Sequence, residues 1–437
     1  MSKHLYLFLT LIVLSFQIQS QIPHPALVGY WQNWNDVNAP HIPIDQVDGR
    51  YNVINVSFAI PQAGTDYRME FIPDQGTPAA FISKIQTLQS QGKKVLISIG
   101  GATAPVSLNN VVERDSFINS MTRILTNYGF DGMDIDLEGS SLALTGGTIN
   151  APIDLPVIHL VEAVKQIMDN YRINFNRKML LTMAPETAFV QGGMSAFGSI
   201  WGAYLPVIHA LRDSMDLLQV QLYNSGSMYG IDGGIYTQGT ADFIVAMTEA
   251  VIQGFTTGGG TFAGLPASKV AVGLPACTMA AGGGFTDTAT VSSAMRYLLG
   301  QGPAPGSYTL TNTAGYPGLG GMMTWSMNWD AIATCGGIYE YAENFEHIFS
   351  STTTSIQENA FMQSPQLYPN PSTGDVFIVI PENVKTGSRF LMMDTQGRTV
   401  LEERFAGSGR IQLHVKELNR GIYFWWMDGY TGKILLE

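Results

Sequence analysis

Eight short apolar runs rich in β-forming residues recur between residues 25 and 330, and amphipathic stretches separate them. Apolar strands that alternate with helices are typical of a parallel sheet whose outer face is covered by helices. The expected strands are Ala26–Tyr30, Val53–Ala59, Lys94–Ile99, Gly132–Leu137, Met179–Met183, Leu217–Leu222, Val270–Leu274 and Met322–Ser326. The expected helices include Ala80–Gln89, Arg114–Tyr128, Leu155–Tyr171 and Ala241–Gln253. Eight such units predict an α/β fold of the (β/α)8 TIM barrel type.

A doubly wound open sheet is the structural alternative to the barrel. Sheets of that kind often carry a glycine-rich phosphate loop between a strand and a helix. The glycine triplets at 258–260 and 282–284 lack this setting and have no lysine directly after them, which favours the barrel.

The first apolar segment predicts export. Lys3 and His4 precede a mostly apolar run from Leu5 to Phe16, and Ser20 follows closely. A basic start, a short apolar run and a small residue describe a secretory signal, with an amphipathic or buried core helix as the alternative. As a helix the run would span about 18 Å, too short for a hydrocarbon core of ~30 Å. We expect a signal peptide at 1–20, no integral membrane segment, and a secreted or surface-attached protein.

A change of composition indicates a second domain. The polar run 350–355 contains only serine and threonine, which predicts a linker over 350–365 between domains at 21–349 and 366–437. Residues 375–437 carry eight basic and eight acidic side chains and read as short strands broken by turns. We therefore expect a small all-β sandwich after the barrel. Its expected strands are Asp375–Ile380, Arg389–Met393, Thr399–Phe405, Gly409–Val415 and Ile422–Met427.

The tail opens with Tyr368-Pro369-Asn370-Pro371 and closes with Gly421-Ile422-Tyr423 and Gly432-Lys433-Ile434. These segments resemble the C-terminal sorting domain of the type IX secretion system. The resemblance implies the secretion machinery as a partner and transit across the outer membrane. The alternative is a carbohydrate-binding sandwich. Trp425 and Trp426 are adjacent on a strand, so they face opposite sides and at most one lies on any binding face.

Composition excludes several other classes of function. The formal net charge of −12 argues against nucleic acid or an anionic membrane surface as a partner. The seven histidines are scattered singly and there are two cysteines, so no metal or cofactor site is expected. In an oxidising compartment we expect Cys277 and Cys335, which follow the last two barrel strands, to form a disulfide.

The most informative segment is the fourth expected strand. Asp134, Asp136 and Glu138 alternate there with apolar residues, so the three acids face one way. Carboxyls stacked about 6–7 Å apart repel one another, which should raise at least one pKa. A carboxyl that keeps its proton near neutral pH can act as a general acid. A solvated acidic face and a calcium site are the alternatives, but a barrel interior is not solvated and a strand lacks calcium-loop geometry.

With Asp131, these acids resemble the Asp-x-x-Asp-x-Asp-x-Glu signature of glycoside hydrolase family 18, the chitinases and their relatives. The resemblance extends along the barrel, and all matches lie at carboxyl ends of expected strands, where barrel active sites are built. The further matching segments are Ser98–Gly101, Met183–Glu186, Gln221–Asn224 and Met323–Ser326.

The resemblance implies substrate-assisted catalysis, in which the 2-acetamido oxygen of the sugar attacks C1 while Glu138 protonates the leaving oxygen. Asp136 would orient the acetamido group, Asp134 would share a proton with Asp136, and Tyr223 would hydrogen-bond the acetamido carbonyl. Asp131 would shape the strand entry. The residues expected to bind substrate are Trp325, Gln221, Asn224, Tyr30, Met183, Ser98 and Gly101. Tyr30, at the end of the first expected strand, is also expected to hydrogen-bond the inner aspartate. Trp31, Trp34, Trp201 and Trp329 are candidates for stacking on further sugars or for ordinary packing.

These features together predict an exported retaining chitinase that acts on chitin or N-acetylglucosamine oligosaccharides. The segment from Pro275 to Gly321 has room for a loop and a helix but not for an extra α+β insertion, which favours cleavage inside the polymer. An endo-β-N-acetylglucosaminidase acting on glycoprotein glycans is an alternative within the same chemistry. A sugar-binding lectin is the alternative of another class, although such relatives usually lose the terminal acid that Glu138 supplies.

Overall fold

A computed structural model describes residues 21–332 and 336–361. In the C-terminal part it describes residues 366–368, 370, 372, 376–380, 387–404, 409–415, 417–427 and 430–436. The predicted signal peptide lies outside the described residues. Contacts divide the chain into two compact units, Met1–Ile348 and Phe349–Glu437.

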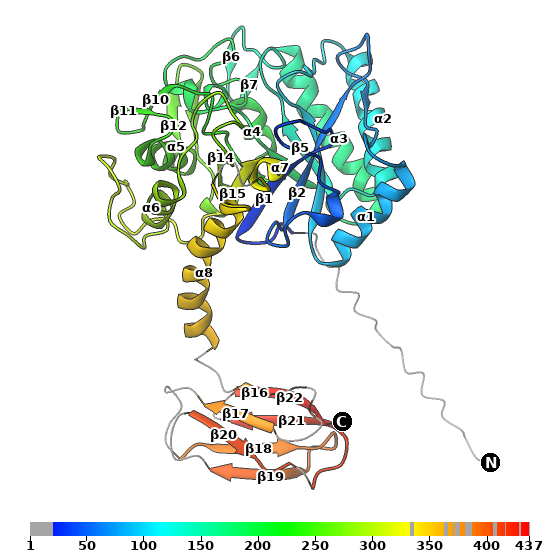
Figure 1. Ribbon diagram of the computed structural model, residues 1–437, viewed down its shortest axis with the longest axis vertical. Coiled ribbons are helices and arrows are strands. Elements are labelled where there is room, and N and C mark those ends of the chain that lie inside the picture. The colour runs from blue at the N-terminus through cyan, green and yellow to red at the C-terminus, as the bar shows by residue number, and fades with distance from the viewer. Residues whose placement is uncertain are drawn as a thin grey trace, which may run out of the picture. The chain divides into compact units, whose positions relative to one another are not determined.

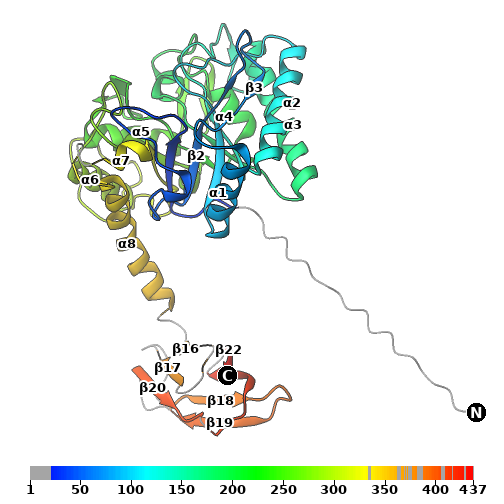
Figure 2. The same cartoon turned by 45° about the vertical axis from the view of Figure 1, so that its right-hand side comes forward.

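The first unit is built on eight parallel strands at its centre, with helices on the outside (Figures 1 and 2). In sheet order the strands are β14 (Ala271–Pro275), β15 (Gly321–Trp325), β1 (Ala26–Gln32), β2 (Val53–Pro61), β4 (Lys94–Gly100), β5 (Gly132–Asp136), β8 (Leu180–Met183) and β9 (Leu217–Leu218). Parallel bridges from Leu218 to Val270 and from Gln221 to Gly273 join the two ends of this order. The predicted TIM barrel is confirmed, and each of the eight strands overlaps its predicted run, although β9 covers only the first two residues of the predicted Leu217–Leu222.

Helices follow most of the strands and cover the outside of the barrel (Figure 1). The α2 helix illustrates how the sequence sets their ends. The side chain of Asn110 accepts from the backbone N–H groups of Val112 and Glu113, and Gly129 ends the helix at φ 72°. The helices are α1 (Pro78–Ser90), α2 (Val111–Tyr128), α3 (Leu155–Phe175), α4 (Leu205–Leu211), α5 (Ala241–Gln253), α6 (Thr288–Leu298), α7 (Met327–Asp330) and α8 (Glu340–Phe361).

Short elements complete the barrel unit. They are β3 (Met69–Glu70), β6 (Gly147–Thr148), β7 (Ala151–Pro152), β10 (Ser227–Tyr229), β11 (Ile235–Thr237), β12 (Phe255–Thr257) and β13 (Gly260–Phe262). Four 3-10 turns cover Ile44–Gln46, Thr187–Phe189, Gln191–Met194 and Ala267–Lys269.

Side chains inside the barrel change from apolar to polar along the strands. Val53, Leu96, Leu180 and Leu217 form a buried cluster near the amino ends of their strands. Residues two further along three of these strands are polar, and on β5 the inward residues are Asp134 and Asp136. The barrel therefore has an apolar base and a polar layer at its carboxyl ends.

One boundary differs from the expectation. The α8 helix runs from Glu340 to Phe361 and passes through much of the segment 350–365 that was predicted as a linker. The helix is anchored on the barrel, because the Tyr341 hydroxyl donates to the Met323 carbonyl at 2.7 Å. Extending an existing helix is far easier than nucleating one, so serine and threonine residues can continue it.

The C-terminal unit consists of two antiparallel sheets, as expected for a small sandwich. One has the order β16-β17-β20 and the other β19-β18-β21-β22. Trp425 is buried against Phe390 and Trp426 is half-buried on the opposite side of the strand. The strands are β16 (Gln366–Tyr368), β17 (Val376–Ile380), β18 (Arg389–Met393), β19 (Thr399–Arg404), β20 (Gly409–Leu413), β21 (Gly421–Met427) and β22 (Tyr430–Leu436); β16 and β22 were not expected.

Two sequence predictions concern covalent structure and membranes. Cys277 is buried and disulfide-bonded, whereas Cys335 lies outside the described residues, so the pairing of these two remains a prediction. Among the described residues, no helix combines the length and apolar character needed to cross a bilayer.

The contact between β5 and β8 leaves no room for a side chain at Gly132. A Cβ there would lie 2.0 Å from the Leu180 carbonyl oxygen, which is backbone and cannot rotate away. We predict that Gly132→Ala lowers the free energy of unfolding by about 1–3 kcal/mol or more, as overpacking does. Guanidinium unfolding monitored by circular dichroism measures this. The control is Gly49→Ala, where a Cβ meets nothing within 4 Å; equal stability of both variants would contradict the prediction.

Candidate active site

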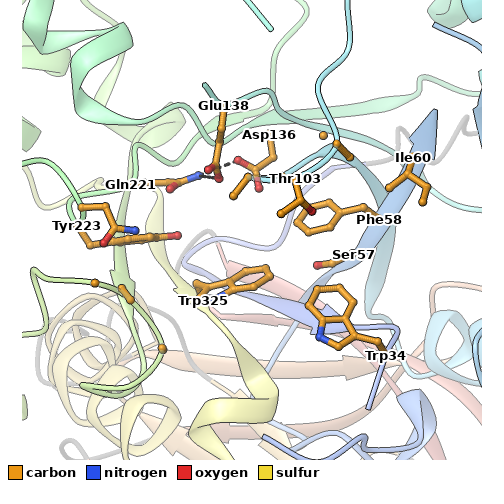
Figure 3. Close-up of a pocket in the computed structure, with 18 of the residues that line it drawn as sticks. Trp34, Ser57, Phe58, Ile60, Thr103, Asp136, Glu138, Gln221, Tyr223 and Trp325 are labelled. Carbon is orange, nitrogen blue, oxygen red and sulfur yellow. Dashed lines mark hydrogen bonds between the residues drawn. The ribbon is translucent and has the colours of Figure 1, made fainter. Parts of the chain in front are cut away.

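A cavity of about 890 Å³ opens at the carboxyl ends of the barrel strands. Figure 3 shows its polar wall, with Asp136, Glu138, Gln221 and Tyr223 pointing toward the same space above Trp325. The lining residues are Asn33, Trp34, Ser57, Phe58, Ile60, Gly100 to Ala104, Asp136, Glu138, Gln221, Tyr223, Asn224, Met279 to Gly282 and Trp325. The active-site face that the sequence predicted is therefore hollowed.

Asp134 lies at the bottom of the polar layer and is fully buried. Its Oδ2 accepts from the hydroxyls of Tyr30 at 2.6 Å and Ser98 at 2.7 Å. Its Oδ1 accepts from the Thr182 hydroxyl at 2.5 Å and from the Gln219 amide at 3.0 Å. Strand register explains the arrangement, since Ser98 on β4 and Thr182 on β8 flank Asp134 on either side.

The amide of Gln221 ties the other two acids together. Its Nε2 donates to Asp136 Oδ1 at 2.7 Å and to Glu138 Oε1 at 2.9 Å, as the dashed lines in Figure 3 mark. It also lies 3.0 Å from the Ala184 carbonyl. Asp136 is buried, whereas Glu138 is half-buried at the cavity wall. The three acids thus form a ladder from the barrel interior to the cavity.

Burial is the main cause of the altered electrostatics. It raises the pKa of Asp134, although its four hydrogen bonds oppose the shift. Burial, together with the charges of Glu138 and Asp134, raises the pKa of Asp136 well above its usual range. The predicted repulsion among stacked carboxyls is therefore found at Asp136, whereas burial alone raises the pKa of Asp134. The pKa of Tyr223 is also raised well above its usual value by burial, Asp136 and Glu138, so its hydroxyl stays protonated.

Aromatic rings form the floor of the cavity. The Trp325 ring is stacked on Phe58 with centroids 5.9 Å apart, and its centroid lies 5.6 Å from that of Tyr30. Trp34 continues this surface toward solvent, 6.2 Å from Trp325. The flat apolar face of a sugar ring matches such a floor, while its hydroxyls and amide face the polar wall.

The acids of the cavity have no metal-site arrangement. Across the described part of the chain, no group of three or more His, Cys, Asp or Glu side chains is placed to hold a metal ion.

The sequence model described as glycosyl hydrolases family 18 matches residues 26–311, which is most of the chain. The chain belongs to this family. A second model, described as a secretion system C-terminal sorting domain, matches residues 366–435. The tail therefore marks the protein for export, to the outside of the cell or its surface.

Several chitinases are similar to this family 18 chain. Chitinase Chi52 of Paenibacillus xylanexedens is 48% identical over 310 residues, which cover 70% of this chain and 58% of that protein. Chitinase D of Niallia circulans is 48% identical over 311 residues, with the same coverage. The crystal structure of a family GH18 chitinase from Chromobacterium violaceum has a TM-score of 0.67 at 37% identity, covering 76% of this chain and 85% of that one. The chain spans about three fifths of the length of the first two relatives.

Three residues predicted to bind substrate lie elsewhere in the family 18 barrel. Tyr30 and Ser98 are buried and donate to Asp134 instead of lining the cavity. For Tyr30 this hydrogen bond to the inner aspartate is the one that the sequence predicted. Met183 is fully buried and does not line the cavity either. Ala184, its neighbour, belongs to the interior cluster, so alternation along β8 turns Met183 away from the interior.

Other predicted residues lie where the family signature implied. Gly101 and Asn224 line the cavity, and a Cβ on Gly101 would come within 2.9 Å of Phe58. Asp131 sits before β5, where it pairs with Arg177 at 2.8 Å and accepts from the Val95 N–H at 3.0 Å. This is a structural position at the amino end of the strand, as expected.

Among the four candidate stacking tryptophans, only Trp34 lines the described cavity. Trp31 and Trp329 are buried, and Trp31 donates to the Ile42 carbonyl at 2.7 Å. Trp201 is half-buried against Gly192, so the three that do not line the cavity pack within the barrel unit.

Sequence reasoning missed two kinds of site residue. Thr182 and Gln219 contact Asp134, and each stands two residues before a position that faces the interior, Ala184 or Gln221. The strand period of two was therefore the signal that could have found them. The lining residue Met279 comes from the loop after β14, for which no periodic signal exists.

The raised pKa of Asp136 predicts an effect on stability. In the folded state Asp136 keeps a proton that the unfolded chain releases near pH 3.8. The stability that this proton contributes is fully present below pH 3.8. It is lost as the pH rises through the raised pKa of the folded state. Asp136→Asn cannot ionise, and we expect its unfolding midpoint at pH 8 to exceed the wild-type value by on the order of 2–4 °C.

Differential scanning calorimetry at pH 4 and pH 8 measures the difference, which should be smaller at pH 4. Asp169→Asn on the exposed surface of α3 is the matched control, with no gain at either pH. An Asp136→Asn protein less stable than wild type at pH 8 would refute the prediction.

Proposed function

We propose that this protein is a chitinase that hydrolyses β-1,4 linkages between N-acetylglucosamine units by substrate-assisted catalysis. One observation carries the proposal. Among the described residues that line the cavity, the acids are Asp136 at the end of β5 and Glu138 two residues beyond it, joined by Gln221. The similarity to named chitinases supports the choice of polymer.

This arrangement favours a nucleophile from the substrate. An ordinary retaining glycosidase places its nucleophilic carboxylate across the scissile bond from the acid. Asp136 ends β5 and Glu138 follows two residues later, so both approach the sugar from one side. The 2-acetamido oxygen of the bound sugar is then the group positioned to attack C1, as known for substrate-assisted glycosidases.

The residues then take distinct parts in the reaction. Glu138 gives its proton to the glycosidic oxygen as the bond to C1 breaks, and the acetamido oxygen forms the new bond to C1. Asp136 accepts a hydrogen bond from the acetamido N–H and faces the positive charge of the oxazolinium ring. Tyr223 donates to the acetamido oxygen. Water next attacks C1, Glu138 takes its proton, and the ring reopens with retained configuration.

The open form of the cavity favours cleavage inside the polymer. Between β14 and β15, residues 276–320 contain α6 and no strand, so no extra domain walls the groove on that side. The same chemistry would serve an endo-β-N-acetylglucosaminidase, whose substrates have a branched glycan instead of a linear polymer. Product analysis by mass spectrometry separates the two: chitin should yield oligosaccharides of several lengths, and a high-mannose glycoprotein should stay intact.

We propose a division of labour along the chain. The barrel domain, predicted at 21–349, carries hydrolysis, and the tail at 366–437 interacts with the type IX secretion machinery during export. The contact division at Ile348 and the two separate family matches support this assignment.

The catalytic assignment predicts graded losses. Glu138→Gln keeps the shape and the bond to Gln221 but has no proton to give, so turnover should fall by about 10²–10⁴. Tyr223→Phe should lose less, on the order of 1–3 kcal/mol of transition-state stabilisation, since one hydrogen bond is removed. Turnover of soluble chitin oligosaccharides measures both effects, and isothermal titration should find ligand binding by the Gln variant.

The control for charge removal is Glu162→Gln, a surface acid paired with Arg114 on the outside of the barrel. It should retain wild-type turnover. A Glu138→Gln enzyme with more than a tenth of wild-type activity would refute the role of Glu138.

The substrate-assisted route makes a second demand. A glucosamine unit without its acetyl group has no carbonyl to attack C1, so cleavage at that unit should stop. A thiazoline analogue of the cyclic intermediate should inhibit in competition with substrate. Defined, partly deacetylated oligosaccharides test this; equal cleavage at acetylated and deacetylated units would indicate that a protein carboxylate is the nucleophile.

A further inference from the structure

The hydrogen bonds of Asp134 and Asp136 are strongly unequal. Asp134 accepts four side-chain donors, two on each oxygen. The amide donor to Asp136 is that of Gln221, which also bonds Glu138. Four donors match the acceptor sites of an ionised carboxylate, whereas a protonated carboxyl would have to donate one bond itself. The donors therefore favour negative charge at Asp134.

Gln219 provides an independent sign of this role. Its Nε2 donates to Asp134 at 3.0 Å, while its Oε1 is buried and has no partner among the described residues. A buried amide oxygen without a hydrogen bond destabilises a fold, so such a group needs an explanation. The contact with Asp134 supplies it.

We propose that Thr182 and Gln219 are positioning residues of the reaction: they hold Asp134 as an anion and so keep the proton of the buried acid pair on Asp136. This inference rests on the proposed function. In the proposed reaction, Asp134 and Asp136 together carry one negative charge, which balances the oxazolinium cation. Asp136 remains the acid that contacts the substrate. Two protons on the pair would remove that charge.

Among the described residues, no cationic side chain pairs with Asp134. The titratable groups that face it are Asp136 on its own strand, Tyr30 on β1 and Tyr204 before α4. Burial raises the pKa of both tyrosines well above the usual value, so they remain neutral. Dipolar donors alone stabilise the anion, and Thr182 and Gln219 supply half of them.

The test is the pH dependence of kcat/KM. Its acid limb reports the first ionisation of the pair, which is that of Asp134 in this scheme. Removing one donor from an anion should shift the acid limb to higher pH by about one unit. We expect this shift for Thr182→Val and for Gln219→Met, with the basic limb and KM unchanged. Thr182→Ser, which keeps the hydroxyl, should restore the wild-type limb.

Thr324→Val is the matched control. Thr324 is equally buried in the barrel sheet, but its hydroxyl donates to the Leu274 carbonyl at 3.0 Å and not to an acid. The acid limb of the kcat/KM profile of Thr324→Val should coincide with that of the wild type. If Thr182→Val and Gln219→Met reduce kcat/KM equally at every pH, both residues are merely structural and the inference is wrong.

A second measurement needs no turnover. The loss of unfolding temperature caused by Thr182→Val should be greater at pH 7 than at pH 4, since the missing donor serves an anion, whereas the Thr324→Val loss should be the same at both. Failure of the wild type to cleave chitin would overturn the proposed function but leave this comparison valid. An equal loss at both pH values would overturn the inference alone.

Discussion

The burial of an acidic side chain among neutral hydrogen-bond donors is the constraint on which this molecule depends. Asp134 is fully enclosed, and its hydrogen bonds come from strands β1, β4 and β8 and from the residue after β9. No two adjacent strands could supply them all. The acid ladder therefore requires the closed barrel, which brings these donors together. The register of the strands sets the hydrogen bonds of Asp134 as well as the packing of the interior.

The polar layer around Asp134 lies next to apolar side chains inside the barrel. Below Asp134 the interior is filled by apolar side chains such as Leu96 and Leu180, which exclude water. Above it, Trp325 and Phe58 give the cavity an apolar floor. Asp134 thus lies directly above an apolar layer, whereas Asp136 and Glu138 line the cavity. Burial is the largest cause of the raised pKa of Asp136. Burial that raises the pKa of Asp136 also lowers the stability of the folded state when this acid is ionised.

The sequence predicted the eight strands and the face of the acids because both depend on periodicity, which is local. It predicted the hydrogen bond of Tyr30 to the inner aspartate, but not that Ser98 donates to the same acid, since alternation gives the face of a residue and not its depth. Met183 is buried and does not line the cavity, because alternation along β8 turns it away from the interior. The α8 helix is held on the barrel by Tyr341, which lies before the predicted linker 350–365. The composition of the linker segment alone therefore could not predict that the helix continues through it.

The graded exposure of the three acids has a consequence for the order of events in a catalytic cycle. Glu138 is half-buried and lines the cavity together with Asp136, whereas Asp134 is fully buried behind them. Hydrogen ions from solvent therefore enter the ladder from the cavity. In the proposed reaction, a bound sugar covers this entry and fixes the number of protons on the acids until the product leaves. In that scheme the charge state of the site is set on binding, before any bond is broken.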